Sequence, residues 1–165
     1  MIITLACDTG VALILYDLLK PVGRSLSLIA ALFRLIFVAV RAVNSLSYFD
    51  AVVLFQNAHS SAAFDTGYGI AMVPFGLHWL LIGYLIFEAI SLPRILGVLL
   101  VLAGLGYLTF LWPRLGSHLC FPYILIPGIV GEGSLVLWLV VMGVNVQQWK
   151  DQANGARADG GPSGS

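Results

Sequence analysis

The chain has 165 residues, of which 59% are hydrophobic and only 10% are charged. Soluble domains carry about 25% charged residues because their surfaces face water. The composition therefore excludes an ordinary soluble domain and predicts an integral membrane protein. The formal net charge is zero, and no basic stripe interleaved with aromatic residues suggests nucleic-acid binding.

Five segments are apolar over a length that suits a membrane-spanning helix, which needs about 20 residues. In chain order the expected spans are 2–19, 26–47, 68–90, 95–112 and 123–145. Short turns containing Pro21 and Pro93 separate the first span from the second and the third from the fourth, since proline disfavours helix at the preceding residue. The predicted fold class is all-α: a polytopic transmembrane helix bundle with five spanning helices, in one domain over residues 1–145.

Two segments fall outside these spans. The connection 48–67 carries aromatic and valine residues at roughly helical spacing. It is either a short helix lying in the membrane interface or a frayed extension of the second span. Residues 146–165 turn polar and then rich in glycine, serine and proline, a composition that predicts a disordered tail.

Lysine and arginine are distributed unequally between the two ends of the predicted bundle. One end carries Lys20, Arg24, Arg94, Lys150 and Arg157, whereas the other carries Arg114. Because cytoplasmic loops are enriched in these residues, we expect the first end and the C-terminus to be cytoplasmic.

Four spans each carry one ionisable residue near the middle: Asp8, Arg34, His78 and Glu132. A charge at the bilayer centre costs roughly 2.5–3.5 kcal/mol, so such residues usually face one another or a wet cavity. We expect Arg34 to lie within ~4 Å of Asp8 or Glu132, the usual limit for an ion pair. The shared centre is either a structural ion pair or a proton or ligand site. Arg41, two turns beyond Arg34, is expected to extend toward the outer interface instead.

Proline and glycine residues mark places where these helices could bend or pack closely. Pro74 removes the donor for the carbonyl of Ile70, four residues before His78, and small residues allow close helix approach. A broken-helix binding site of the transporter type is the alternative interpretation. The residues assigned to helix packing or kinking are Pro74, Gly97, Gly104, Pro127, Gly128 and Gly131.

The sequence contains no motif for a metalloprotease, a phosphate-binding loop or a serine-nucleophile elbow. His78 is the one histidine within an expected span, while His59 and His118 belong to connections. This is poor support for a haem held by two histidines. We therefore expect no enzymatic activity, no catalytic residues, no metal and no cofactor.

The string LPRILGVLLVLAGLGYL over residues 92–108, with shorter strings around Cys7-Asp8, Phe33-Arg34-Leu35, Leu77-His78 and Glu132, resembles a bacterial integral membrane family, domain of unknown function 4386. The resemblance covers nearly all of residues 4–145. It implies a multi-pass protein of the bacterial inner membrane and assigns no chemistry. Family members have one further spanning helix before the segment that opens this chain, so the resemblance also implies an N-terminally shortened member.

Three functions remain open from the sequence. The first is a non-enzymatic, multi-pass membrane protein whose buried polar centre specifies helix packing. The second is a transporter or proton-coupled small-molecule binding protein that uses His78 and Glu132. The third is a redox subunit that binds haem or quinone. The expected partner is the lipid bilayer; self-association or a second membrane protein is left open, and the ligand is not determined.

Overall fold

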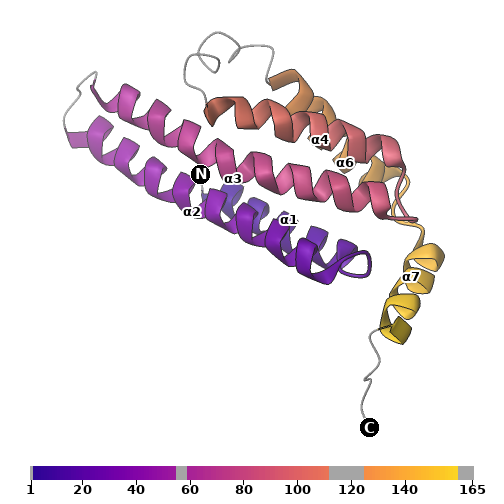
Figure 1. Cartoon of the computed structure of the whole chain (residues 1–165). Coiled ribbons are helices and arrows are strands. Elements are labelled where there is room, and N and C mark those ends of the chain that lie inside the picture. Colours follow the sequence, from indigo (N-terminus) through magenta and orange to yellow (C-terminus); the bar gives the residue numbers. More distant parts are fainter. Residues whose placement is uncertain (1, 55–58, 112–124, 160–165) are drawn as a thin grey trace.

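The computed structural model describes the backbone of residues 2–54, 59–111 and 125–159, and the side chains of 3–46, 67–111 and 126–155 other than that of Pro127. The regular elements among these residues are all helical, which confirms the predicted all-α class (Figure 1). They are α1 (Ile2–Leu19), α2 (Arg24–Leu54), α3 (His59–Glu88), α4 (Arg94–Leu108), the short 3-10 helix η1 (Thr109–Leu111), α6 (Leu125–Val141) and α7 (Val146–Asp159).

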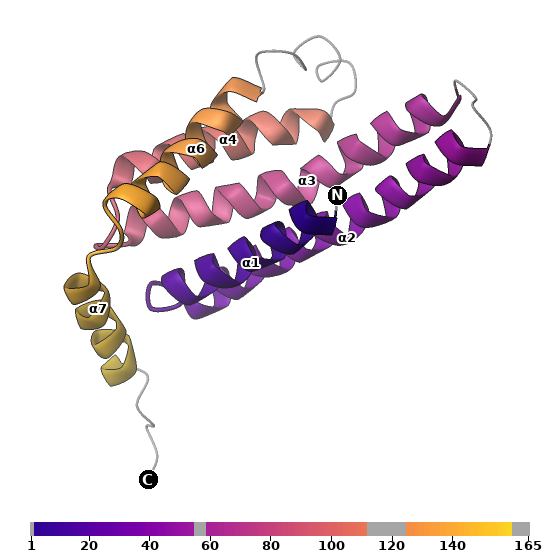
Figure 2. The same cartoon turned by 180° about the vertical axis from the view of Figure 1, so that it is seen from behind.

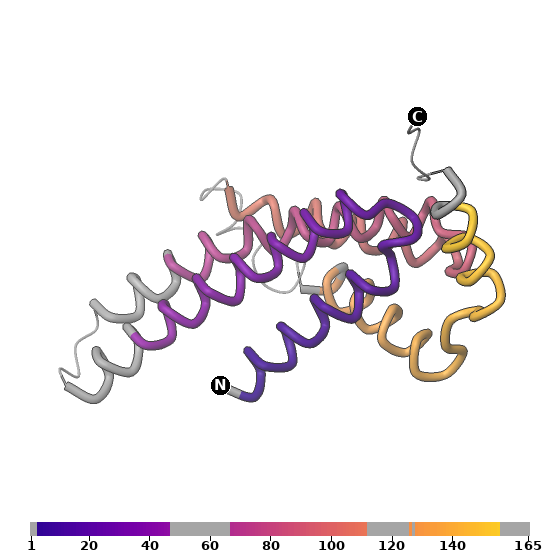
Figure 3. The backbone as a smooth tube through the Cα atoms, turned by 90° about the horizontal axis from the view of Figure 1, so that it is seen from below, coloured from indigo at the N-terminus to yellow at the C-terminus, as the bar shows by residue number. Residues whose placement is uncertain are grey.

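Helices α2, α3 and α4 lie side by side in one layer, with α3 in the middle (Figure 2). Helix α1 packs against α2, and α6 packs against α4. Figure 3 shows that α1 and α6 lie on the same side of this layer. The face of α3 between them is therefore framed by two helices that come from opposite ends of the chain.

The core is built mainly from α3. Trp79, Ile82, Leu85 and Ile86 of this helix are at most 2% exposed. The outward faces of the flanking helices are apolar instead. Their large aliphatic residues are between 48% and 65% exposed, such as Leu28, Leu32 and Ile36 of α2, Leu102 of α4 and Leu137 of α6. Soluble proteins rarely expose apolar surface on this scale, so the outside of the bundle suits lipid.

The helices of the structure give fewer candidate membrane spans than the five expected from the sequence. Among the described residues, Arg24–Leu46, Gly67–Glu88 and Arg94–Leu111 are each long and apolar enough to cross a membrane. Helices α6 and α7 would give a fourth if the pair, bent by 104°, forms one broken span. The expected five spans are therefore not confirmed. Helix α6 is shorter than the span expected over 123–145 because it ends at Val141.

Two glycine pairs allow α3 and α4 to approach closely. A Cβ added to Gly97 would lie 2.6 Å from the carbonyl oxygen of Gly83, and one added to Gly104 would lie 2.8 Å from that of Gly76. No side chain fits at these distances, so each position needs glycine. Gly97 and Gly104 were singled out in the sequence, whereas their partners on α3 were not, although they share the same spacing of seven residues.

The polar C-terminal segment corrects one prediction. We expected disorder over 146–165, but α7 occupies Val146–Asp159. Helix α6 stops where Gly143 adopts a left-handed conformation with φ +67°, as is common at helix C-termini. The side chain of Asn145 then accepts the backbone N–H of Gln148 at 3.2 Å, which caps the new helix. The indole N–H of Trp149 donates to the carbonyl of Leu18 at 2.9 Å, which ties α7 to the end of α1.

The described part of the connection over 48–67 does not form the separate interfacial helix that was one of the two expectations. Backbone up to Leu54 continues α2, and backbone from His59 already belongs to α3. The described part therefore agrees with the alternative, an extension of the second span. Residues 55–58 and the side chains over 47–66 lie outside the described part of the chain.

Candidate functional site

The buried centre of the bundle is organised around Arg34 of α2. This residue is 4% exposed, and its Nη2 atom lies 2.6 Å from Oδ1 of Asp8 on α1. A buried guanidinium needs a paired anion because an isolated charge is very costly away from water. Of the two carboxylates considered from the sequence, Asp8 makes this contact, and Glu132 is not within ion-pair distance of Arg34.

Aromatic rings surround the same guanidinium. Its Cζ atom lies 4.8 Å from the ring centroid of Phe75, 5.3 Å from that of Trp79 and 6.0 Å from that of Phe37. Phe75 and Trp79 come from adjacent turns of α3, and Phe37 comes from α2. These cation–π contacts stabilise a desolvated cation. These three rings were not among the residues expected at the centre, although the spacing of four residues from Phe75 to Trp79 places both on one face.

Several buried polar atoms in this centre lack a hydrogen-bond partner within the described protein. They are Nε and Nη1 of Arg34, Nε1 of Trp79 and Nε2 of His78. Trp79 is 2% exposed and His78 is 1% exposed. The great majority of buried polar groups are hydrogen-bonded, so four such atoms on three neighbouring side chains are unusual.

His78 has a defined proton position. Its Nδ1 atom lies 2.8 Å from the carbonyl oxygen of Ala30, and a carbonyl can only accept a hydrogen bond. The proton is therefore on Nδ1, and Nε2 of the neutral ring is an acceptor. The ring also packs edge-on against Trp79, with centroids 4.9 Å apart.

Arg41 was expected to extend toward the outer interface, but its guanidinium lies close to the centre. Its Nη1 atom is 3.9 Å from Oδ2 of Asp8, and its Cζ atom lies 5.6 Å from the ring centroid of Phe37. Asp8 therefore lies between two arginines of α2, one buried and one with a side chain that is 38% exposed. The spacing of seven residues that put both arginines on one face explains why one carboxylate reaches both.

Glu132 of α6 approaches the centre from the other flank. The hydroxyl of Tyr107 donates to its Oε1 atom at 2.9 Å, and the ring of Tyr107 packs against Phe75 with centroids 4.8 Å apart. The indole of Trp79 also lies beside this carboxylate. Tyr107 thus links the carboxylate of α6 to the aromatic rings around the guanidinium.

The small residues near Glu132 have separate roles. The hydroxyl of Tyr107 would clash with a Cβ at Gly128, and a Cβ at Gly131 would lie 3.1 Å from the carbonyl oxygen of Leu99. Both glycines therefore let α6 lie against α4. The backbone of Pro127 is in the first turn of α6, where a helix has no internal partner for its N–H groups, so it does not break the helix beside Glu132.

Pro74 lies within α3, four residues before His78 and one before Phe75. The helix continues through it over His59–Glu88. Proline in a helix interior removes one backbone hydrogen bond.

The four ionisable residues singled out in the sequence lie around one stretch of α3. Asp8 and Arg34 are bonded to each other, whereas His78 and Glu132 are bonded to different partners.

The polar centre carries equal numbers of formal positive and negative charges. We define it as Asp8, Arg34, Arg41, His78 and Glu132 together with Trp79 and Tyr107. It contains two guanidinium groups and two carboxylates, and of the two carboxylates Asp8 is the one in contact with the arginines. The two carboxylates stand on helices that do not pack on each other, since no described residue of α1 has its Cα within 8 Å of one in α6. Among the described residues no group of three or more histidine, cysteine, aspartate or glutamate side chains could hold a metal.

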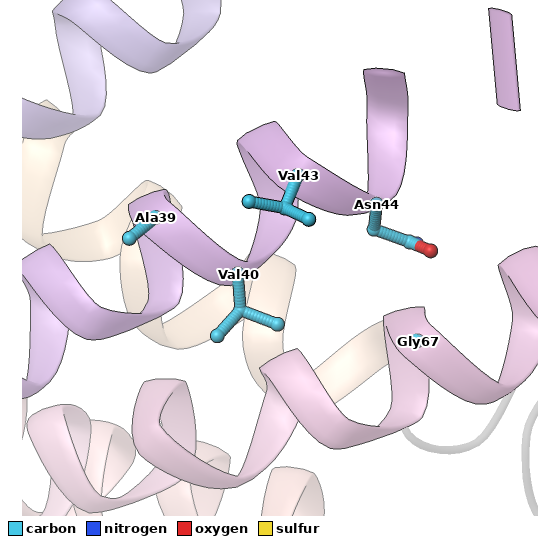
Figure 4. A pocket seen from close by; sticks show the side chains of 5 residues that line it. All are labelled: Ala39, Val40, Val43, Asn44 and Gly67. Carbon is cyan, nitrogen blue, oxygen red and sulfur yellow. The ribbon is translucent and has the colours of Figure 1, made fainter. Parts of the chain in front are cut away.

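A second feature is an open groove of about 400 Å³ between α2 and α3 (Figure 4). It is lined by Ala39, Val40, Val43, Asn44 and Gly67. The described lining is almost wholly apolar and contains no ionisable side chain. These described residues therefore offer no chemistry comparable with that of the polar centre.

The chain has relatives among known proteins. No solved structure matches the chain. A protein of Archaeoglobus fulgidus described as "Uncharacterized protein" is 28% identical over 136 residues, which cover 82% of this chain and 76% of the relative. The profile of the family described as "Domain of unknown function (DUF4386)" matches residues 1–143. The chain belongs to this family.

Proposed function

We propose that the chain is a non-enzymatic membrane protein that binds a small polar solute at the polar centre and couples this binding to a proton. The observation that carries the proposal is the buried guanidinium of Arg34, two of whose three nitrogens have no hydrogen-bond partner in the described protein. The indole N–H of Trp79 and the Nε2 atom of His78 also make no hydrogen bond of normal geometry within the described protein. A solute or water that accepts and donates hydrogen bonds would satisfy these atoms.

A purely structural polar centre fits this geometry less well. A buried ion pair is stable when further hydrogen bonds satisfy the remaining protons of both ions. Here Arg34 makes one such contact, to Asp8, and the rest of its surface faces aromatic rings. The rings reduce the cost of the buried charge but leave directional N–H groups available. Glu132 is held by Tyr107 rather than by a cation, which leaves a carboxylate that can gain or lose a proton without breaking an ion pair.

We further propose five spanning helices in the bacterial inner membrane, with the C-terminus in the cytoplasm. The α1–α2 turn, the α3–α4 turn and α7 lie at the same end of the bundle (Figure 1), and this end carries Lys20, Arg24, Arg94 and Lys150. The excess of cationic residues supports a cytoplasmic location. A reporter fused after Ser165 should be active only in its cytoplasmic form; a fusion active in the periplasm would reverse the orientation.

Proteoliposomes provide the test of the proposed function. Purified protein is reconstituted into vesicles that contain a pH-sensitive dye, and a pH gradient is imposed with and without a small-molecule extract of bacterial cells outside. We expect the extract to accelerate decay of the gradient beyond the rate in protein-free vesicles. Glu132→Gln should abolish the additional rate, because an amide cannot carry the proton.

The matched control is Glu88→Gln at the exposed end of α3, which should behave like the unchanged protein. Equal rates in protein-containing and protein-free vesicles would refute proton-coupled solute binding. Equal rates for Glu132→Gln and the unchanged protein would refute the role of Glu132.

A further inference from the structure

The donors and charges of the polar centre also restrict the chemical class of the solute. Arg34 offers Nε–H and Nη1–H, both buried and without a hydrogen-bond partner in the described chain. Trp79 offers Nε1–H, which lies beside the carboxylate of Glu132. A guanidinium and an indole can only donate hydrogen bonds. The solute must therefore supply at least two acceptor atoms, and an anionic acceptor makes the stronger bonds.

The charge balance limits how much negative charge the site can receive. With both carboxylates ionised, the two negative charges of Asp8 and Glu132 equal in number the two positive charges of Arg34 and Arg41. A bound monoanion would then leave one uncompensated negative charge, which is costly at this depth in a membrane. Protonation of Glu132 removes that excess, and the hydrogen bond from Tyr107 can be kept by a carboxylic acid, whose oxygens still accept.

We infer that the polar centre binds a small monocarboxylate together with one proton, the carboxylate on the N–H groups of Arg34 and Trp79 and the proton on Glu132. This inference rests on the proposed function and names the class of its solute. The carboxylate oxygens accept from donors on α2 and α3, while the proton is carried on α6. Binding of either species favours binding of the other, because each cancels the charge of the other.

Among the described residues, the charged or titratable groups around Glu132 are all part of this balance. The groups are Asp8 from α1, Arg34 and Arg41 from α2, Tyr68 and His78 from α3, and Tyr107 from α4. The arginines keep their charge under all conditions. Asp8 is held between the two arginines, so Glu132 is the carboxylate without a cation in contact. It is therefore the group that exchanges the proton.

Calorimetric titration of the purified protein in detergent micelles tests this inference. The probes are acetate, butyrate and benzoate, each compared with its uncharged amide in a buffer free of chloride. We expect at least one carboxylate to bind more tightly at pH 6 than at pH 8, and its amide not to bind. Titration in two buffers with different ionisation enthalpies should show uptake of about one proton for each carboxylate bound.

Variants separate the roles of the donors from that of the proton carrier. Trp79→Phe keeps the ion pair of Arg34 and removes one donor, so affinity should fall on the order of tenfold or more. Glu132→Gln is permanently neutral and should bind the carboxylate without proton uptake and with little dependence on pH. The controls are Tyr84→Phe, whose side chain is exposed, and Glu88→Gln.

Several results would overturn the inference. Equal binding of the amides, or binding of chloride but of no carboxylate, would exclude a monocarboxylate site. Proton uptake that persists in Glu132→Gln would exclude the assigned proton carrier. If the cell extract accelerates proton flux in proteoliposomes but none of the carboxylates binds, the inferred solute class is wrong while the proposed function stands. If neither occurs, both are wrong.

Discussion

The buried pair of Arg34 and Asp8 leads to a quantitative prediction about stability. Asp8→Asn removes the carboxylate and leaves a guanidinium that is 4% exposed without its anionic partner at 2.6 Å. The guanidinium cannot be deprotonated in a protein, so the folded bundle has no way to neutralise it. Breaking a buried pair in this way costs about 3–5 kcal/mol, and we expect the free energy of unfolding to fall by that amount.

The opposite substitution should behave differently with pH. Arg34→Gln leaves the carboxylate of Asp8 in place, and a carboxylate can take up a proton whereas a guanidinium cannot lose one. Arg41 also still faces Asp8 at 3.9 Å. The loss of stability in Arg34→Gln should therefore become smaller as the pH is lowered, because a proton neutralises the unpaired group. The loss in Asp8→Asn should persist over the same range.

The assay is equilibrium unfolding in mixed micelles, with helix content and tryptophan fluorescence as two readouts. Arg41→Gln is the matched control, since it removes the other arginine that faces the same carboxylate. Its side chain is 38% exposed and its contact is long, so we expect a cost below about 1 kcal/mol. If Asp8→Asn costs no more than Arg41→Gln, the pair with Arg34 does not stabilise the bundle as argued.

Three further substitutions test other contacts, each in the same unfolding assay unless stated. Gly97→Ala places a Cβ against a carbonyl of α3 and should cost about 1–3 kcal/mol, whereas Gly133→Ala, with nothing within 4 Å, should not destabilise; equal effects would contradict the seam between α3 and α4. Tyr107→Phe removes the donor to the carboxylate of α6 and should cost about 1–3 kcal/mol, while Tyr84→Phe on the exposed surface should be nearly neutral. Asn145→Ala removes the cap of α7 and should cost about 1 kcal/mol of local stability, seen as faster amide exchange in α7 alone; unchanged exchange would exclude the cap.

Helical content and much of the element order could be predicted because they depend on local properties of the chain. Apolar runs of sufficient length, interrupted by Pro21 and Pro93, predicted where helices begin and end near α1, α2 and α4. The end of α6 was missed because the left-handed conformation at Gly143 and the cap at Asn145 are single-residue signals at the end of an apolar run, next to a polar segment that resembled a disordered tail. The contact of Trp149 with Leu18 joins residues far apart in sequence, so no local pattern could reveal it.

The sequence by itself determined that the protein is apolar and helical and has ionisable residues near the middle of its helices, because composition and helical period depend on residues that are close together in the chain. It also singled out Arg34 as the group that must find an anion, since a guanidinium keeps its charge. Only the tertiary structure decided which carboxylate that is. Helix α1 packs on α2 and α6 packs on α4, so Asp8 reaches Arg34 while Glu132 meets Tyr107. A choice between two chemically similar partners depends on the arrangement of helices in space, which no periodicity within one helix can specify.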